Sequence, residues 1–327
     1  MEQIILKFKI RLLSIVILLK KIISIYLLPK AFIKARYIRF LSDNNNACVI
    51  ILYQHIGDLI CAEPLSSYLK NYNNHNKKII WIVNNKFAEL LTLFKDVDVV
   101  VPVSSVSEIV YINLFLSGIE VHNLHFDGLR CQKYELVLKN SNKICNYHNY
   151  MYYGSLIECF SVTGGLPRLK MKPSLNLNKK STFQVPQMPY IAFQTEAREE
   201  LRRWSKDKWV KFLSDYSDYQ FLEVSLKPNY AFLPNCNSNY CGKLSLVDIA
   251  YLIKGASLYI GIDSSVAHYA NALGKKSLIL LGDYHGSKDY VPFVVDNENF
   301  KILRSENKVA DISVEEVKAV FETMLKN

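Results

Sequence analysis

The sequence predicts an α/β protein built from two Rossmann-like domains, each a doubly wound parallel sheet. Short apolar runs bounded by turn residues alternate with helical patterns over 47–103 and again over 190–282, as is typical of parallel sheets with right-handed crossovers. A tract with several Gly, Pro and Lys residues, 163–189, separates the two stretches and predicts a linker. The 327 residues suffice for two domains of ordinary size. The predicted parts are an N-terminal segment and two domains: 1–45, 46–175 and 176–327.

Charge and cysteine content limit the possible partners. Residues 1–40 hold nine Lys or Arg against one Glu, so they carry +8 of the formal net charge of +10. The basic character therefore belongs to the N-terminal segment, and we expect no nucleic-acid partner. The seven cysteines include no CxxC pair, which argues against a disulfide framework and a structural zinc site and fits a reducing compartment.

The N-terminal segment is predicted to be a basic amphipathic helix at a membrane surface. Between residues 4 and 29 no uncharged run exceeds eight residues, and Lys20 and Lys21 lie in the middle. A spanning helix needs roughly 20 mostly apolar residues, so a helix lying in the membrane interface fits better. A helix packed on the protein's own surface and a signal anchor remain open alternatives.

The first domain is predicted to follow the order strand, turn, helix. Gly57 is expected to let the backbone turn tightly at the strand end, which places Asp58 at the mouth of the sheet and at a helix N-terminus. There an Asp can serve as a helix N-cap or as a functional carboxylate. The predicted elements are strand Ala47–Tyr53, helix Leu59–Lys70, strand Ile79–Val83, helix Lys86–Phe94 and strand Val97–Val103.

The second domain is predicted to repeat this order. The turn Asp263-Ser264-Ser265 lies beyond a strand's carboxyl end, where doubly wound sheets bind ligands, and the N–H groups of the following helix would suit a phosphate. Alternatively, Asp263 or Ser264 is only an N-cap and His268 a packed helix residue. The predicted elements are strand Tyr190–Gln194, strand Phe221–Val224, helix Ser245–Lys254, strand Leu258–Ile262, helix Val266–Leu273, strand Ser277–Leu281 and helix Val314–Leu325.

Three stretches resemble motifs of the heptosyltransferases, glycosyltransferase family 9. Residues 263–282, DSSVAHYANALGKKSLILLG, resemble the family's DSG signature. Residues 54–70, QHIGDLICAEPLSSYLK, resemble its first motif, and residues 195–213, TEAREELRRWSKDKWVKFL, resemble its third. The family's usual residues are replaced at five positions: His55, Glu63, Ser205, Ser265 and Lys276.

The resemblance implies a GT-B fold, two domains facing across a cleft, and a set of site residues. Asp58 would be the catalytic base, with Gly57 and His55 on the acceptor side. No metal and no cofactor are implied. The residues implied to bind the donor are Thr195, Arg202, Arg203, Glu223, Asp263, Ser264, Ser265 and His268.

The implied activity is an inverting, metal-independent transfer of a sugar, most simply heptose from ADP-heptose, onto a lipopolysaccharide core or similar lipid-linked glycan. The membrane segment over residues 1–40 would hold the enzyme peripherally at the inner face of the cytoplasmic membrane. Two alternatives remain open at this point. One is another nucleotide-sugar enzyme on a GT-B scaffold, of the hydrolysing epimerase type, and the other is a catalytically degenerate, membrane-docked assembly partner.

Overall fold

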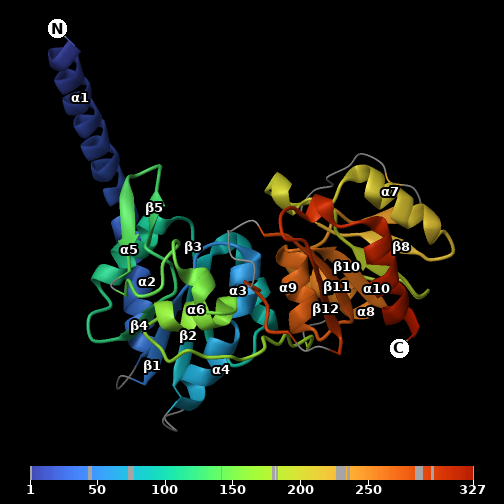
Figure 1. The fold of residues 1–327 in the computed structure, drawn as a ribbon. Coiled ribbons are helices and arrows are strands. Elements are labelled where there is room, and N and C mark those ends of the chain that lie inside the picture. Colours follow the sequence, from blue (N-terminus) through green and yellow to red (C-terminus); the bar gives the residue numbers. More distant parts are fainter. Residues whose placement is uncertain are drawn as a thin grey trace.

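The computed structural model folds into two lobes, with one long helix projecting from the first (Figure 1). For residues 2–8 and 237–239 only the backbone is described. The residues described are 2–42, 46–72, 77–140, 142–178, 181, 183–225, 233, 236–283, 290–295 and 298–326.

The first lobe contains a parallel sheet in the order β3-β2-β1-β4. Alternate residues of β1 enter opposite cores: Cys48 and Ile50 face one side, Val49 and Ile51 the other. This is the burial expected of a parallel strand covered on both faces. The strands are β1 (Ala47–Ile51), β2 (Lys78–Asn84), β3 (Val99–Val103) and β4 (Glu120–Asn123), and an antiparallel hairpin adds β5 (Gly128–Cys131) and β6 (Leu136–Lys139).

Helices cover both faces of this sheet. One core gathers residues of α3, α4 and α6, and the other gathers residues of α2 and α5. The helices are α2 (Leu28–Leu41), α3 (Ile56–Ala62), α4 (Pro64–Asn71), α5 (Val106–Leu114) and α6 (Leu156–Thr163).

Two predicted helices of this lobe differ from the structure. The helix expected over Leu59–Lys70 is two helices that meet at Glu63 and Pro64, because a proline lacks the N–H that a continuous helix needs there. The stretch expected as helix Lys86–Phe94 forms two 3₁₀ turns, η4 (Asn85–Phe87) and η5 (Leu90–Leu93).

The second lobe contains a parallel sheet in the order β12-β11-β10-β7-β8-β9. Helices α7 and α10 pack on one face and α8 and α9 on the other. The strands are β7 (Ile191–Phe193), β8 (Phe221–Glu223), β9 (Cys236–Asn239), β10 (Leu258–Ile262), β11 (Ser277–Leu281) and β12 (Phe300–Arg304). The helices are α7 (Lys206–Asp215), α8 (Leu246–Gly255), α9 (Ser265–Ala272) and α10 (Val314–Lys326), with 3₁₀ turns η7 (Glu200–Arg202) and η8 (Val309–Asp311); a further 3₁₀ turn, η6 (Tyr150–Tyr152), precedes α6 in the first lobe.

The two lobes touch through helices that begin at the carboxyl ends of their central strands. Helix α3, after β1, packs against α9, after β10. One hydrophobic core therefore runs from the first lobe into the second. This contact holds the carboxyl-end edge of the first sheet opposite the carboxyl-end edge of the second.

The N-terminal segment divides into two helices with different surroundings. Helix α2 packs on α5, with Ala31, Ala35 and Ile38 fully buried. Its Lys34 bonds Glu108 at the start of α5 at 2.6 Å, and its Arg39 bonds the Phe115 carbonyl after α5 at 2.6 Å. Since α5 begins where β3 ends, α2 begins at the carboxyl-end edge of the first sheet.

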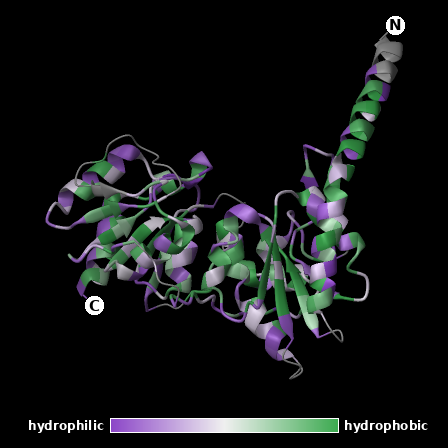
Figure 2. Cartoon of the chain, turned by 180° about the vertical axis from the view of Figure 1, so that it is seen from behind, coloured by the Kyte–Doolittle hydropathy of each residue, from purple (hydrophilic) through white to green (hydrophobic). Residues whose placement is uncertain are grey.

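Helix α1 (Glu2–Ile23) leaves this edge and projects from the lobe (Figure 1). Most of its described residues from Ile10 to Ile23 are apolar and exposed, and hydrophobic residues predominate along the helix in Figure 2. By length and apolar composition alone the helical run Lys9–Leu41 could cross a membrane, and little of its most apolar 18-residue window is buried. The apolar surface of α1 is therefore wider than the apolar face of the predicted amphipathic helix.

Candidate active site

A cavity of about 560 Å³ lies between the lobes. Its walls come from the turns that follow the central strands of both sheets. From the first lobe it receives the β1–α3 turn, including His55, Gly57 and Asp58. From the second lobe it receives the segment after β7 and the β10–α9 turn, with Arg202 and Asp263 among its residues. The carboxyl ends of two parallel sheets thus share one cleft, as ligand sites in such folds do.

Asp58 lies in the first turn of α3 and is partly exposed to the cavity. Burial, and then the negative charge of Asp263, raise the pKa of its carboxyl to about 7, while the positive charge of Arg202 opposes the shift. Removal from water disfavours the charged form of a carboxyl. Asp58 therefore exchanges its proton near neutral pH, as a general base must.

The β1–α3 turn is made differently from the prediction. The residue with positive φ is His55, at 67°, whereas Gly57 lies within α3. A Cβ on Gly57 would lie 2.6 Å from Cδ2 of His268 on α9. The expectation that Gly57 turns the backbone was wrong, because glycine is required here for close approach of the two lobes.

His55 faces the second lobe across the cavity. Burial, and then the positive charge of Arg198, lower the pKa of its imidazole. A non-glycine residue with φ near +60° is uncommon and concentrates at functional sites. The strain at His55 is therefore located at the cavity wall, where the β1–α3 turn meets Arg198.

A charged group lies opposite Asp58. The guanidinium of Arg202 lies 3.6 Å from the Asp263 carboxylate, and Nε2 of His268 lies 4.0 Å from the same carboxylate. The other ring nitrogen of His268 lies 3.0 Å from the Cys61 thiol of α3. Burial lowers the pKa of His268 to about 4, so the ring is neutral at physiological pH and acts through hydrogen bonds rather than charge.

The start of α9 is held by a glutamine from the neighbouring strand. Ser264 is the N-cap, yet its hydroxyl donates to Oε1 of Gln194 at 2.5 Å, and among the described residues no side chain caps this helix end. The Tyr259 hydroxyl donates to the same oxygen at 3.4 Å. Ser264 and Ser265 both line the cavity, so the N-terminus of α9 points its positive dipole end toward the space between the lobes.

Three predicted donor residues do not line this cavity. The Thr195 hydroxyl donates to Glu223 at 2.6 Å, and both residues are buried beneath the floor of the cleft. Arg203 donates twice to the Ala197 carbonyl, at 3.0 and 2.9 Å. Their assignment to the donor remains a prediction, whereas Asp58, Arg202, Asp263, Ser264, Ser265 and His268 are brought together with His55 and Gly57.

The structure adds cavity residues that the sequence motifs did not single out. Gln194 and Arg198 enter from the segment after β7. Cys61 of α3 does not line the cavity, but its thiol contacts the ring of His268, which does. His125 also lines the cavity, and its Nε2 accepts the backbone N–H of Tyr53 at 3.0 Å. His125 is a candidate on sequence alone, because the loops of the first domain are expected to meet the acceptor. Gln194 could have been found from the rule that ligands gather at strand ends, since it directly follows β7.

Solved structures share this architecture over most of both chains. A glycosyltransferase family 9 protein from Veillonella parvula DSM 2008 matches with a TM-score of 0.63 and 14% identity, covering 86% of this chain and 97% of that one. E. coli ADP-heptose LPS heptosyltransferase II matches with a TM-score of 0.62 and 16% identity, covering 85% and 98%. E. coli heptosyltransferase WaaC with ADP matches with a TM-score of 0.57 and 15% identity, covering 85% and 99%. No curated protein matches in a sequence search.

Two facing parallel sheets with a carboxylate-bearing cleft between their carboxyl ends define a GT-B glycosyltransferase fold, and the likenesses confirm that prediction. A family model also matches just under half of the sequence. Residues 155–310 match the model of glycosyltransferase family 9 (heptosyltransferase). The chain therefore carries a family 9 domain, as its motifs predicted, and is a glycosyltransferase.

Proposed function

We propose that this protein is an inverting, metal-independent heptosyltransferase that moves heptose from ADP-heptose onto a lipopolysaccharide core or a similar lipid-linked glycan. The observation that carries the proposal is Asp58, a cleft carboxyl with a pKa raised to about 7 that faces Arg202 and Asp263 across the cavity. One lobe thus offers a base and the other offers positive charge for a leaving diphosphate.

In the proposed reaction, a hydroxyl oxygen of the acceptor attacks the anomeric carbon of the donor sugar. The bond from that carbon to the diphosphate oxygen breaks, and its electron pair leaves with ADP. The hydroxyl proton passes to Asp58. Attack from the face opposite the leaving group inverts the anomeric configuration.

The leaving diphosphate would be stabilised by the second lobe. Arg202 offers a planar fork of donors suited to phosphate oxygens, and the N-terminus of α9 adds backbone N–H groups and the helix dipole. These groups supply the positive potential that a metal would otherwise bring. The nucleotide assignment is supported by the matched structures, of which one holds ADP and another is named for ADP-heptose.

The lipid-linked acceptor is supported by α1. Its exposed apolar side chains project from the lobe, beside a basic composition that suits an anionic cytoplasmic leaflet. We propose that α1 inserts into the membrane surface and that the enzyme works peripherally at its cytoplasmic face.

The test of the base is Asp58→Asn. The amide cannot accept the hydroxyl proton, so transfer should fall by about 10²-fold or more, in the range attributed to a general base. ADP-heptose binding, measured by calorimetry, should stay within a few-fold of the native value. Retention of full transfer by Asp58→Asn would remove Asp58 as the base.

Glu63→Gln is the matched control. Burial also raises the pKa of Glu63 to about 7, but its carboxylate accepts the backbone N–H groups of Lys95 and Ser174 and does not line the cavity. Transfer by this variant should remain near native, because only the cleft carboxylate meets substrate.

Two measurements address the alternatives. An epimerase would release free sugar or its epimer from ADP-heptose with no acceptor present, and an assembly partner would bind ADP-heptose without any turnover. Mass spectrometry of the lipopolysaccharide from a strain lacking this protein identifies the missing sugar and the acceptor.

A further inference from the structure

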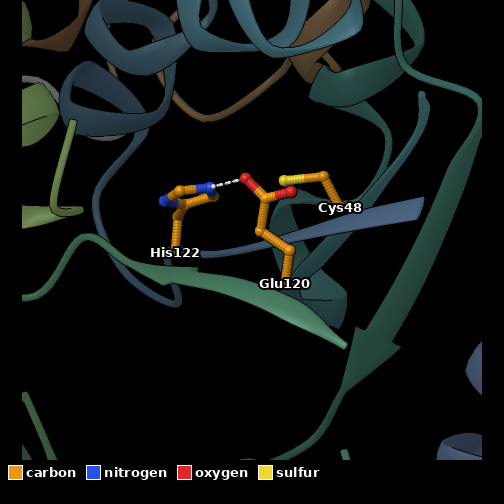
Figure 3. Close-up of side chains that lie close together, drawn as sticks. All are labelled: Cys48, Glu120 and His122. Atoms are coloured by element: carbon orange, nitrogen blue, oxygen red, sulfur yellow. Dashed lines mark hydrogen bonds and ion pairs between the residues drawn. The ribbon is translucent and has the colours of Figure 1, made fainter. Parts of the chain in front are cut away.

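Outside the cleft, three side chains with metal-binding atoms meet near the amino end of β1. Cys48 comes from β1, and Glu120 and His122 come from β4 (Figure 3). The parallel register pairs Cys48 with Glu120 and Ile50 with His122, so the strand alternation brings all three side chains to one face of the sheet. Their ligand atoms lie within 4.8 Å of one another.

The hydrogen bonds of His122 fix its tautomer. Its Nδ1 lies 2.7 Å from the carbonyl oxygen of Gly164, at the C-terminal cap of α6. A carbonyl only accepts, so Nδ1 carries a proton. In the neutral ring Nε2 then bears a lone pair, and this lone pair faces Oε1 of Glu120 at 3.0 Å.

Two acceptors at that distance require a cation or a proton between them. A proton on Nε2 would use only the imidazole and the carboxylate. The third group is the Cys48 thiol, which is fully buried and has no hydrogen-bond partner among the residues that the structure describes. A metal ion would use all three.

The surroundings resemble the outer shell of a metal site. Lys77 holds the other carboxylate oxygen of Glu120, which leaves Oε1 as a single ligand. The Gly164 carbonyl orients the imidazole, as second-shell acceptors do for ligating histidines. The Glu120 side chain is 36% exposed, so solvent can supply a fourth ligand.

We propose that Cys48, Glu120 and His122 form a binding site for a divalent transition metal, with Zn²⁺ as the chemical best fit. Thiolate, imidazole and carboxylate are the ligands that Zn²⁺ prefers, in tetrahedral geometry. On binding, the thiol releases its proton to solvent and Nε2 of His122 coordinates through its lone pair. The ion would join β1, β4 and the end of α6, away from the cleft at the opposite end of the sheet.

The test uses Co²⁺ as a spectroscopic substitute for Zn²⁺. The full-length protein, stripped with chelator and titrated with Co²⁺, should develop the near-ultraviolet charge-transfer band of a thiolate ligand at one equivalent. Zn²⁺ should abolish the band by displacement and should raise the Tm, because it binds only the folded state. A native protein that shows neither the band nor a Zn²⁺-dependent Tm shift would refute the site.

Variants assign the ligands. Cys48→Ser should lose the band, and His122→Gln should weaken Co²⁺ binding by about 10-fold or more while keeping thiolate absorption at saturation. Cys131→Ser is the matched control, since Cys131 is a half-buried cysteine on β5 outside the cluster, and its band should equal the native one. An undiminished band in Cys48→Ser would overturn the assignment of Cys48 as the thiolate ligand. If Cys48→Ser does not fold, the weaker Co²⁺ binding expected of His122→Gln provides the test.

Discussion

At the scale of single residues, Asp58 and Asp263 place two carboxyl groups in the wall of one cavity. The negative charge of Asp263 disfavours the ionised form of Asp58, and Arg202 partly compensates. The raised pKa of Asp58 makes it a stronger base than an exposed aspartate while keeping a large ionised fraction at neutral pH. The environment of Asp58 thus suits proton transfer near neutral pH, whereas the burial of its charge does not stabilise the fold.

This arrangement predicts how transfer depends on pH. Only the ionised form of Asp58 accepts the acceptor's proton, so kcat/KM should rise with pH and level off above an apparent pKa of about 7. The measurement is a pH profile of transfer with ADP-heptose and a defined glycolipid. A profile that is flat between pH 5.5 and 8.5, chosen to span the raised pKa, would contradict it.

The same shift predicts the pH dependence of stability. The folded state holds the Asp58 proton up to about pH 7, whereas the ordinary value is 3.8. The folded form therefore binds more protons in this window, and the free energy of unfolding contributed by Asp58 falls as pH rises through it. The side-chain amide of Asp58→Asn does not titrate, so this variant does not lose stability as the pH rises. Its Tm should therefore exceed the native Tm by more at pH 8 than at pH 4.5, and calorimetry measures the difference. An equal difference at both pH values would refute the shift.

Gly57 gives a prediction about the contact between lobes. In Gly57→Ala the new Cβ meets the His268 ring, which Phe293 confines at a centroid distance of 4.5 Å. Overpacking should cost about 1–3 kcal/mol of the free energy of unfolding. In a His268→Ala background the same substitution should cost little, and denaturant unfolding of the four proteins measures the coupling. Equal costs in both backgrounds would show that the two residues do not meet.

At the scale of elements, α1 and α2 are separated by only four residues but differ in their surroundings. Helix α2 covers one face of the first sheet, while α1 has few contacts with the lobe. The residues under α2 include Val49, Ile51, Ile80 and Ile82, all buried.

This difference predicts two outcomes for truncation. Deletion of residues 1–19 should leave the Tm and ADP-heptose binding near native, because nearly all of the side chains described there, from Lys9 onward, are exposed. Deletion of residues 1–40 should destabilise the lobe severely, since each uncovered aliphatic side chain loses about 1.5–3 kcal/mol. Thermal unfolding of both truncations is the measurement. A stable protein lacking residues 1–40 would show that α2 is dispensable.

The elements also show which parts of the fold can be predicted from the sequence. Strands such as Leu258–Ile262 and the turn at Asp263 were predicted because local periodicity and turn residues define them. The break at Glu63 was missed although Pro64 signals it, because the helical pattern continues on both sides. The Cys48–Glu120–His122 cluster could not be predicted, because it depends on the register between β1 and β4, which no local sequence pattern encodes. Likewise, the role of Gly57 depends on His268, a residue of the other lobe.

At the scale of the whole molecule, most of the net positive charge lies away from the cleft between the lobes. Most of the net positive charge belongs to residues 1–40, which lie in α1 and α2 on the first lobe. The remaining chain is nearly neutral. Attraction to an anionic surface should therefore act on one end of the molecule and orient it.

The prediction is that the full chain binds anionic phospholipid vesicles and that the protein lacking residues 1–19 does so far less, as flotation would show. Salt should weaken the interaction, because electrostatic attraction at 0.5 M is screened over a few ångströms. Binding that salt reduces only in part would reflect insertion of the apolar side chains. Equal flotation of the full and truncated proteins would rule out α1 as the anchor.

Helix α1 leaves the first lobe at the same sheet edge from which Asp58 faces the cleft. If α1 enters a bilayer as proposed, an acceptor embedded in the same leaflet approaches that edge by lateral diffusion. The encounter is then a search in two dimensions rather than three. The rate of transfer would depend on how many acceptor molecules occupy each unit of membrane area, and diluting them with inert lipid would slow the enzyme even at constant total amount.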